Sequence, residues 1–377
     1  MARTISSTAL SLLLTVVAIP AQAKAPTDCW EIHSLGTLGG DFSNATGVND
    51  AGQVVGNAAT EPRILDPADP PVSLLRAFIS APNGGAITEI LTPGFFFGTA
   101  AAINNVGQVV GDSTIGRSFP VSYFTDPGGG NVQVTLGFAS ARDINNVGQT
   151  LWDVSYPNFR AVIGPNEQPD LGGTDLIDVT VPVDAQDINF ESVALNDAGQ
   201  VAVNAGPFFA PSAAYRWSSY EGAIPLAPDA DSSHAAGMNE AGQVVGTLQH
   251  GGVSQAFITG RHNTSLTLLG KPGDGNSPTG INNFAQIVGT RPLGSEVHGY
   301  VTVPFIVHRS IDLDTLDEVT RDGWSELRPV AINNRGQIAG TGTISEEDRA
   351  FLLSPQSILA FIPDHDGKHA KCFRGAP

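Results

Sequence analysis

Cysteine and positive charge are both scarce in this chain. Two cysteines in 377 residues rule out a disulfide-dense scaffold and a cysteine-rich zinc domain. Lys and Arg total 19 against 37 Asp and Glu, so the formal net charge is −18. Nucleic-acid binders and proteins that coat anionic membranes show the opposite balance. We therefore predict that neither nucleic acid nor a membrane surface is the partner.

Catalytic signatures are also missing. The sequence has no Gly-x-Ser-x-Gly elbow, no His-Glu-x-x-His, no phosphate loop and no dinucleotide glycine fingerprint, and its eight His residues are scattered. From this we predict no catalytic residues, no cofactor and no metal site.

Helical periodicity is absent as well, and we expect almost no helix. Gly and Pro are abundant instead, at 43 and 26 residues, and hydrophobic residues make up 41%. Many short strands joined by tight turns require that composition, and the aliphatic residues suffice for a core.

The N-terminus resembles a secretory signal. Arg3 precedes an apolar stretch over 9–19, and Ala21-Gln22-Ala23 fits the small-x-small cleavage rule. The apolar stretch is too short to span a bilayer, which needs roughly 20 residues. We predict a signal peptide over 1–23, one repeat domain over 24–363 and a C-terminal tail over 364–377, in a protein that is secreted or periplasmic.

One unit recurs seven times. An apolar residue precedes Asn, a turn follows, and then Gln begins a mostly β-branched strand. The repeat Asn residues are Asn49, Asn104, Asn145, Asn196, Asn239, Asn282 and Asn333. The repeat Gln residues are Gln53, Gln108, Gln149, Gln200, Gln243, Gln286 and Gln337. The mean spacing of about 47 residues is typical of a propeller blade.

The unit predicts a hairpin whose loop is a type I turn followed by a left-handed residue. Glycine takes that last position in six copies: Gly52, Gly107, Gly148, Gly199, Gly242 and Gly336. Ala285 replaces it in the sixth, where we expect a strained or differently shaped turn, at a cost of about 1 kcal/mol. The repeated Asn and Gln have two interpretations, a structural role at the turn and a polar ring along a central channel. We favour the structural one, because a residue needed in every copy usually serves folding.

A small residue followed by a bulky one, as in Ala77-Phe78 and Ala350-Phe351, marks a third strand per unit, and a Leu-Gly element marks a fourth. Seven such units predict an all-β, seven-bladed β-propeller. The chain begins mid-unit, near Ile32, and ends on a spare third strand, near Phe351. We therefore expect the two ends to share the closing blade, and Cys29 and Cys372 to form a disulfide there.

These motifs resemble the HAF repeat family of exported bacterial proteins, from Leu35-Gly36 through the Asn-Asp-Ala-Gly-Gln hairpin at 49–53 to Ala77-Phe78. The resemblance spans nearly the whole predicted domain and implies an exported, β-propeller-like fold. It departs at the family's His, which here is found only at His298, before Gly299-Tyr300.

Three polar segments invite a metal interpretation: 364–369, with two His among carboxylates, and the acidic loops 229–233 and 274–277. We interpret the first as a polar tail and the others as turns, because neither loop completes a calcium pattern.

The leading function hypothesis is a monomeric, non-catalytic binding protein for an extracellular or periplasmic glycan or protein, with its binding residues unknown. The rival is a polymer-degrading hydrolase or lyase that uses carboxylates at a propeller face. Asp143, which breaks the Gly/Ala rule of its strand position, is the weak candidate for that role. The insertions over 57–75, 165–190 and 310–327 are where loops could bind a ligand.

Overall fold

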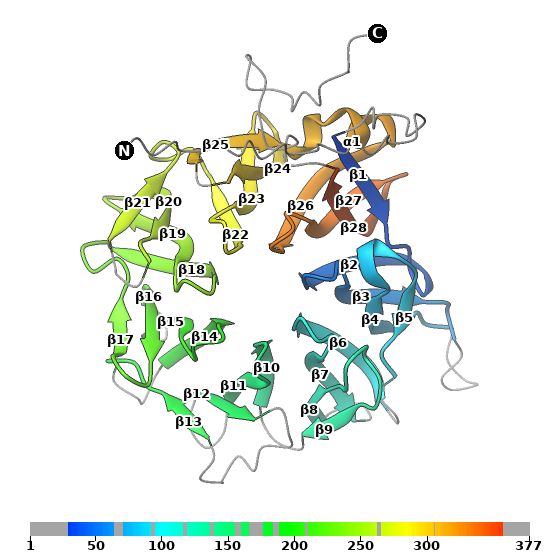
Figure 1. The fold of residues 1–377 in the computed structure, drawn as a ribbon, viewed down its shortest axis with the longest axis horizontal. Coiled ribbons are helices and arrows are strands. Elements are labelled where there is room, and N and C mark those ends of the chain that lie inside the picture. Colours follow the sequence, from blue (N-terminus) through cyan, green and yellow to red (C-terminus); the bar gives the residue numbers. More distant parts are fainter. Residues whose placement is uncertain are drawn as a thin grey trace, which may run out of the picture.

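The computed structural model describes residues 29–63, 71–91, 95–115, 119–135, 139–154, 160–165, 176–183, 188–207, 210–261, 265–304 and 306–356. In these ranges the chain forms seven four-stranded sheets arranged as a ring (Figure 1). The structure thus confirms the prediction of an all-β, seven-bladed propeller.

Six blades are built from consecutive strands, with the first strand nearest the centre of the ring (Figure 1). Blades 1 to 3 comprise β2 (Gly39–Val48), β3 (Val54–Thr60), β4 (Leu75–Ser80), β5 (Ile87–Glu89), β6 (Phe95–Ile103), β7 (Val109–Ile115), β8 (Phe119–Phe124), β9 (Gln133–Thr135), β10 (Ala139–Ile144), β11 (Gln149–Val154), β12 (Arg160–Pro165) and β13 (Ile177–Val179). Blades 4 to 6 comprise β14 (Ile188–Leu195), β15 (Val201–Pro207), β16 (Ala213–Ser218), β17 (Gly222–Pro225), β18 (Ser232–Met238), β19 (Val244–His250), β20 (Val253–Thr259), β21 (Leu266–Leu269), β22 (Ser277–Ile281), β23 (Ile287–Leu293), β24 (Glu296–Val303) and β25 (Ile306–Asp312).

The seventh blade joins the two ends of the described chain. It consists of β26 (Trp324–Ile332), β27 (Ile338–Ile344), β28 (Glu347–Pro355) and, outermost, β1 (Trp30–Ser34). β1 pairs antiparallel with β28, and Ile32 lies opposite Leu353. The predicted sharing of the closing blade is therefore confirmed. It links the two ends of the described chain through one hydrogen-bonded sheet.

Each blade is packed on both faces, which explains the run of apolar residues after the repeat Gln. Val54 and Val55 are neighbours in β3 and point to opposite faces of the sheet, yet both are fully buried. Every blade is sandwiched between two others, so the first residues of its second strand are apolar on both sides, as in buried sheets generally.

The hairpin loops follow one scheme. In the first copy the Gly52 amide donates to the Asn49 carbonyl at 2.9 Å, and Gly52 has a φ of 72°. Ala285 has a φ of 56° and makes the same bond to Asn282, at 3.0 Å. The sixth turn therefore keeps the common shape and places an alanine in the strained left-handed region.

The repeat Asn side chains connect neighbouring blades. Each Nδ2 donates to the backbone carbonyl of the Asn in the next blade, at distances of 2.8 to 3.4 Å. The last of these bonds runs from Asn333 back to Asn49. Seven bonds thus form a closed ring, and each buried bond contributes roughly 0.5–1.5 kcal/mol.

A second ring lies beside the first. The backbone amide of the residue after each repeat Asn donates to the side chain at the same position of the next blade, at 2.7 to 3.0 Å. The residues that form it are Asp50, Asn105, Asn146, Asp197, Glu240, Asn283 and Asn334. The polar character of this loop position is thus required by contacts between blades.

The inner strands approach one another closely near the axis. Each has an irregularity in register just before the repeat Asn, for example between Pro278 and Gly280. A methyl group on Gly280 would lie 3.1 Å from the Val330 carbonyl oxygen. This crowding explains the small residues at that position in six blades.

The insertion over 310–327 contains the one α-helix of the described residues, so the expectation of almost no helix misses a short element. A 3-10 turn, η2 (Leu313–Thr315), leads into α1 (Asp317–Arg321). Leu313 and Val319 are buried in the core of the closing blade. Glu318 accepts the Cys29 amide at 2.8 Å. The insertion therefore covers that core and holds the start of β1.

Candidate functional site

An axial channel runs through the centre of the ring. Its larger cavity, of about 540 Å³, is lined by the inner-strand ends and hairpin loops of all seven blades. A second cavity, of about 440 Å³, shares Val193, Ala236, Thr279 and Val330 with the first. We call the end at the repeat Asn loops the hairpin mouth, and the end near Glu191 and His234 the opposite mouth. Both volumes lie within the usual range of small-molecule sites.

The hairpin mouth is acidic. Asp50, Asp197 and Glu240 belong to its second hydrogen-bonded ring, and the Asp50 carboxylate also accepts both the amide and the side chain of Asn334. Burial raises the pKa of Glu240, and the neighbouring charges of Asp197 and Asp50 raise it further. These carboxylates support the ring and create a negative potential at this end.

Asp143 is the inner-strand residue that replaces Gly or Ala, and it lines the channel. One carboxylate oxygen accepts the Leu195 amide of the next blade at 2.7 Å, and the other accepts the Ile144 amide at 2.8 Å. Burial, opposed by these two bonds and reinforced by Glu240, raises the pKa of Asp143 to about 7. The sequence alone identified Asp143 as an exception to the Gly/Ala rule. The structure adds that it links blades 3 and 4.

The opposite mouth differs from blade to blade. Glu191 on β14 and His234 on β18 form an ion pair at 3.0 Å, and both side chains are about half exposed. The hydrogen bond from His234 lowers the pKa of Glu191, and the same bond raises the pKa of His234. Asn204 also donates to Glu191, at 3.2 Å.

A second ion pair lies next to the first. Arg142 on β10 contacts Asp153 at 2.7 Å, and the other oxygen of Asp153 accepts the Ser192 hydroxyl. The charge of Arg142 also lowers the pKa of Glu191. Blades 3 to 5 thus bring together four ionisable side chains that are far apart in the sequence.

Part of this wall belongs to a repeated contact between blades that was not predicted from the sequence. Eight residues after the repeat Asn, Asn57, Asp112, Asp153 and Asn204 each reach across to a backbone amide of the next inner strand. The fixed spacing and polar type were visible in the repeats. The last three blades carry Thr at this position.

The repeat Gln side chains lie behind the hairpins and are not among the lining residues of either cavity. Each Oε1 accepts the amide of its own repeat Asn, at 2.8 to 3.1 Å. The structure thus places the repeat Gln residues outside the channel, bonded to the repeat Asn side chains.

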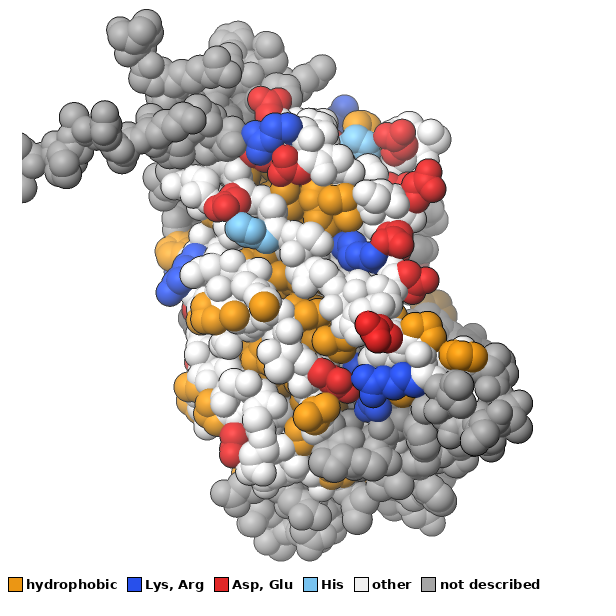
Figure 2. All heavy atoms as spheres, turned by 90° about the vertical axis from the view of Figure 1, so that its right-hand side faces the viewer, with side chains coloured by type: hydrophobic (Ala, Val, Ile, Leu, Met, Phe, Trp, Pro, Cys, Tyr) orange, Lys and Arg blue, Asp and Glu red, His pale blue; other side chains and the backbone are white. Residues whose placement is uncertain are grey.

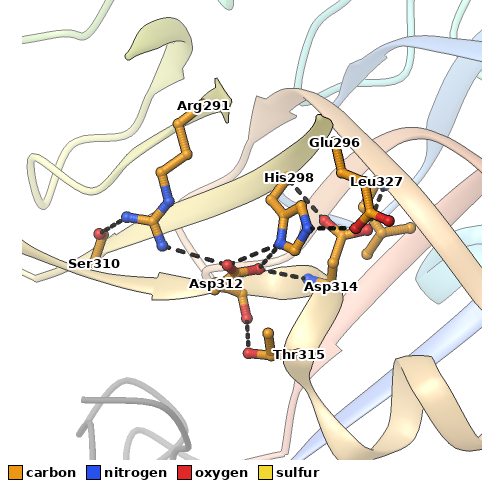
Figure 3. Close-up of polar contacts among 9 residues, drawn as sticks. Arg291, Glu296, His298, Ser310, Asp312, Asp314, Thr315 and Leu327 are labelled. Carbon is orange, nitrogen blue, oxygen red and sulfur yellow. Dashed lines mark hydrogen bonds and ion pairs between the residues drawn. The ribbon is translucent and has the colours of Figure 1, made fainter. Parts of the chain in front are cut away.

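One group of described residues has the spacing of a metal site, His298, Asp312 and Asp314 in blade 6 (Figure 3). Asp314 already accepts the amides of Gly299 and Leu327, and Arg291 lies 3.6 Å from Asp312. Burial alone would lower the pKa of His298, but its bonds to Asp312 and Glu296 raise it. The His298 imidazole and the Arg291 guanidinium are thus already paired with these carboxylates, and the cluster anchors the insertion over 310–327.

The carboxylates of the two acidic loops accept hydrogen bonds from backbone amides of their own turns or of a neighbouring turn. Asp274 accepts the amides of Lys271 and Asn276, and Asp231 accepts the Gly251 amide. The segment 364–369, the predicted signal peptide over 1–23 and Cys372 lie outside the described residues. Cys29 is buried at the closing blade, and its pairing with Cys372 stays a prediction.

The outer wall on the side of β1 and β5 shows acidic and basic side chains interspersed, with hydrophobic ones in small groups between them (Figure 2). No helix among the described residues is both long and apolar enough to cross a membrane.

The fold and channel define an all-β, seven-bladed propeller. No protein-family model matches the chain, and no curated protein matches it. Solved structures match in fold. The β-propeller domain of the trilobed protease from Pyrococcus furiosus, which has an open velcro topology, is 9% identical with a TM-score of 0.55, over 84% of this chain and 96% of that one. YCF48 bound to D1 peptide is 12% identical with a TM-score of 0.50, over 88% and 97%. TolB from Acinetobacter baumannii is 14% identical with a TM-score of 0.44, over 70% of this chain and 62% of TolB, so the chain spans less than two thirds of TolB.

Proposed function

We propose that this chain is an exported, non-catalytic binding protein of the HAF repeat kind, and that its ligand occupies the axial channel at the opposite mouth. The observation that carries the proposal is the contrast between the two mouths. At the hairpin mouth the loop side chains bond the backbone of the neighbouring loops, whereas Glu191 and His234 are half exposed to the cavity. Similar propellers bind ligands, as the YCF48 structure with its peptide illustrates.

A channel-filling variant tests this proposal. Ala236 lines both cavities, so Ala236→Trp should block the channel, whereas Thr267→Trp places the same side chain on the exposed outer strand of the same blade. A panel of glycans, peptides and metal ions would be screened by thermal shift, because a ligand that binds the folded state raises the melting temperature. We expect a ligand that stabilises the wild type and Thr267→Trp but not Ala236→Trp. Equal shifts in both variants, or no shift with any compound, would contradict the proposal.

A hydrolase or lyase is the second candidate, and Asp143 favours it. A channel carboxyl with a pKa of about 7 could exchange a proton near neutral pH. Its two bonds to backbone amides argue for a structural role instead. Under the binding proposal, Asp143→Asn retains ligand binding. Loss of a polymer-cleaving activity in Asp143→Asn, with binding retained, would support the enzyme.

A further inference from the structure

We infer that the ligand of the opposite mouth is a neutral, polyhydroxylated molecule such as the end of a glycan chain. This inference rests on the proposed function and names the chemistry of the same site. The smaller cavity offers hydrogen-bonding groups that are unused within the described chain, and the charges in its wall are already paired.

The first step concerns the free atoms of the ion pair. The bonds from His234 and Asn204 to Glu191 both end on Oε2, and the His234 bond uses Nε2. Glu191 Oε1 and His234 Nδ1 make no hydrogen bond to a described residue. The free Glu191 oxygen can accept a hydrogen bond, and the His234 ring nitrogen can donate or accept one, depending on its tautomer. Two adjacent ligand hydroxyls could bond both atoms, because each hydroxyl both donates and accepts.

The second step concerns the rest of the wall. Thr247 lies on β19 opposite His234, and Ser277 lies on β22. Their hydroxyls bond no other described residue. Pro278, Val330 and two alanines also line this cavity. Short hydroxyls among small apolar surfaces suit a ligand that presents both hydroxyl and C–H groups.

The third step concerns charge. Glu191 and His234 are the ionisable residues that line this cavity, and they neutralise one another when His234 is protonated. Arg142 is paired with Asp153 next to them. An anionic ligand would face Glu191, and a cationic ligand would face His234 and Arg142, so either would have to compete with a formed pair. A neutral ligand avoids that cost.

The experiment compares three probes by isothermal titration. They are neutral glucose and N-acetylglucosamine oligosaccharides, uronic-acid oligosaccharides and oligolysine. We expect a neutral oligosaccharide to bind best, with an affinity that changes less than about twofold between low and high salt, because only charged ligands are strongly screened. Glu191→Gln should weaken it about tenfold, since a carboxylate is the stronger acceptor. Glu221→Gln, the same charge change at an exposed turn of the same blade, should not.

The outcomes separate the two proposals. If uronate or oligolysine binds best and Ala236→Trp abolishes that binding, the channel proposal stands and the neutral-ligand inference is wrong. If no probe depends on the channel, both are wrong. A neutral sugar that binds equally well to Glu191→Gln would also overturn the inference, because its contacts would lie elsewhere.

Discussion

The two mouths of the channel are built from the same seven strands, yet they obey different constraints. At the hairpin mouth, seven nearly identical loops bond one another in two closed rings. At the opposite mouth, the corresponding strand ends carry Glu191, His234 and Ser277, which differ from blade to blade. A position that must close a ring is restricted in every copy, whereas a position that faces only the cavity is free to specialise.

The largest effect is expected at the hairpin mouth. Asn282→Ala removes the bond to the Asn333 carbonyl and the bond to Gln286, and it leaves the amides of Phe284 and Gln286 without their acceptor. We expect a loss of ~2–3 kcal/mol in the free energy of unfolding, measured by urea denaturation. Asn283→Ala, which affects only the more exposed second ring, is the matched control and should cost less. Equal costs would show that the first ring is not the stronger link.

Asp143, in the channel wall between the two mouths, should make the stability of the protein depend on pH. Its folded-state pKa of about 7 lies above the ordinary value of 3.8, so the folded protein holds this proton more tightly than the unfolded chain. The contribution to stability is complete below about pH 4 and is lost as the pH rises through 7. Melting temperatures of wild type and Asp143→Asn from pH 4 to 8 should therefore differ in slope, with the wild type declining more steeply. Parallel curves would mean that Asp143 titrates normally.

A smaller effect is expected at the strained turn. Ala285→Gly removes a left-handed alanine with a φ of 56° and should stabilise the protein by ~1 kcal/mol in urea denaturation. Ala241→Gly, one position earlier in the blade 5 loop, has no positive φ to relieve and serves as the control. It should be neutral or slightly destabilising because glycine is more flexible in the unfolded chain. The strain argument fails if Ala285→Gly brings no gain.

The smallest effect on stability is expected at the opposite mouth. Glu191→Gln removes one partner of a half-exposed pair and should change the free energy of unfolding by less than ~1 kcal/mol. The pKa of His234, which the bond to Glu191 raises, should fall toward 6.5, as followed by an NMR titration of the imidazole. An unchanged His234 pKa would show that the pair does not form in solution.

The fold could be predicted from the sequence because the repeats encode local physics. The positive φ of Gly52, the apolar run after the repeat Gln and the spare Ala350-Phe351 strand each follow from short segments. The site could not be predicted in the same way. Arg142, Asp153, Glu191 and His234 lie on three blades, and only the packing of neighbouring blades brings them to one wall. The role of the repeat Asn was predicted only in part: the sequence predicted its turn but not its bond to the next blade.

The sequence by itself determined the blade number, the turn chemistry and the strand that closes the ring, because the turn residues and the apolar strand residues lie within short segments that repeat along the chain. The tertiary structure alone decided which side chains meet across blades. It placed the Asn amides in a continuous ring, raised the pKa of Asp143 by burial and paired Glu191 with His234. Those contacts depend on how sheets stack around an axis, and residues 41 to 55 positions apart in the chain become neighbours only there.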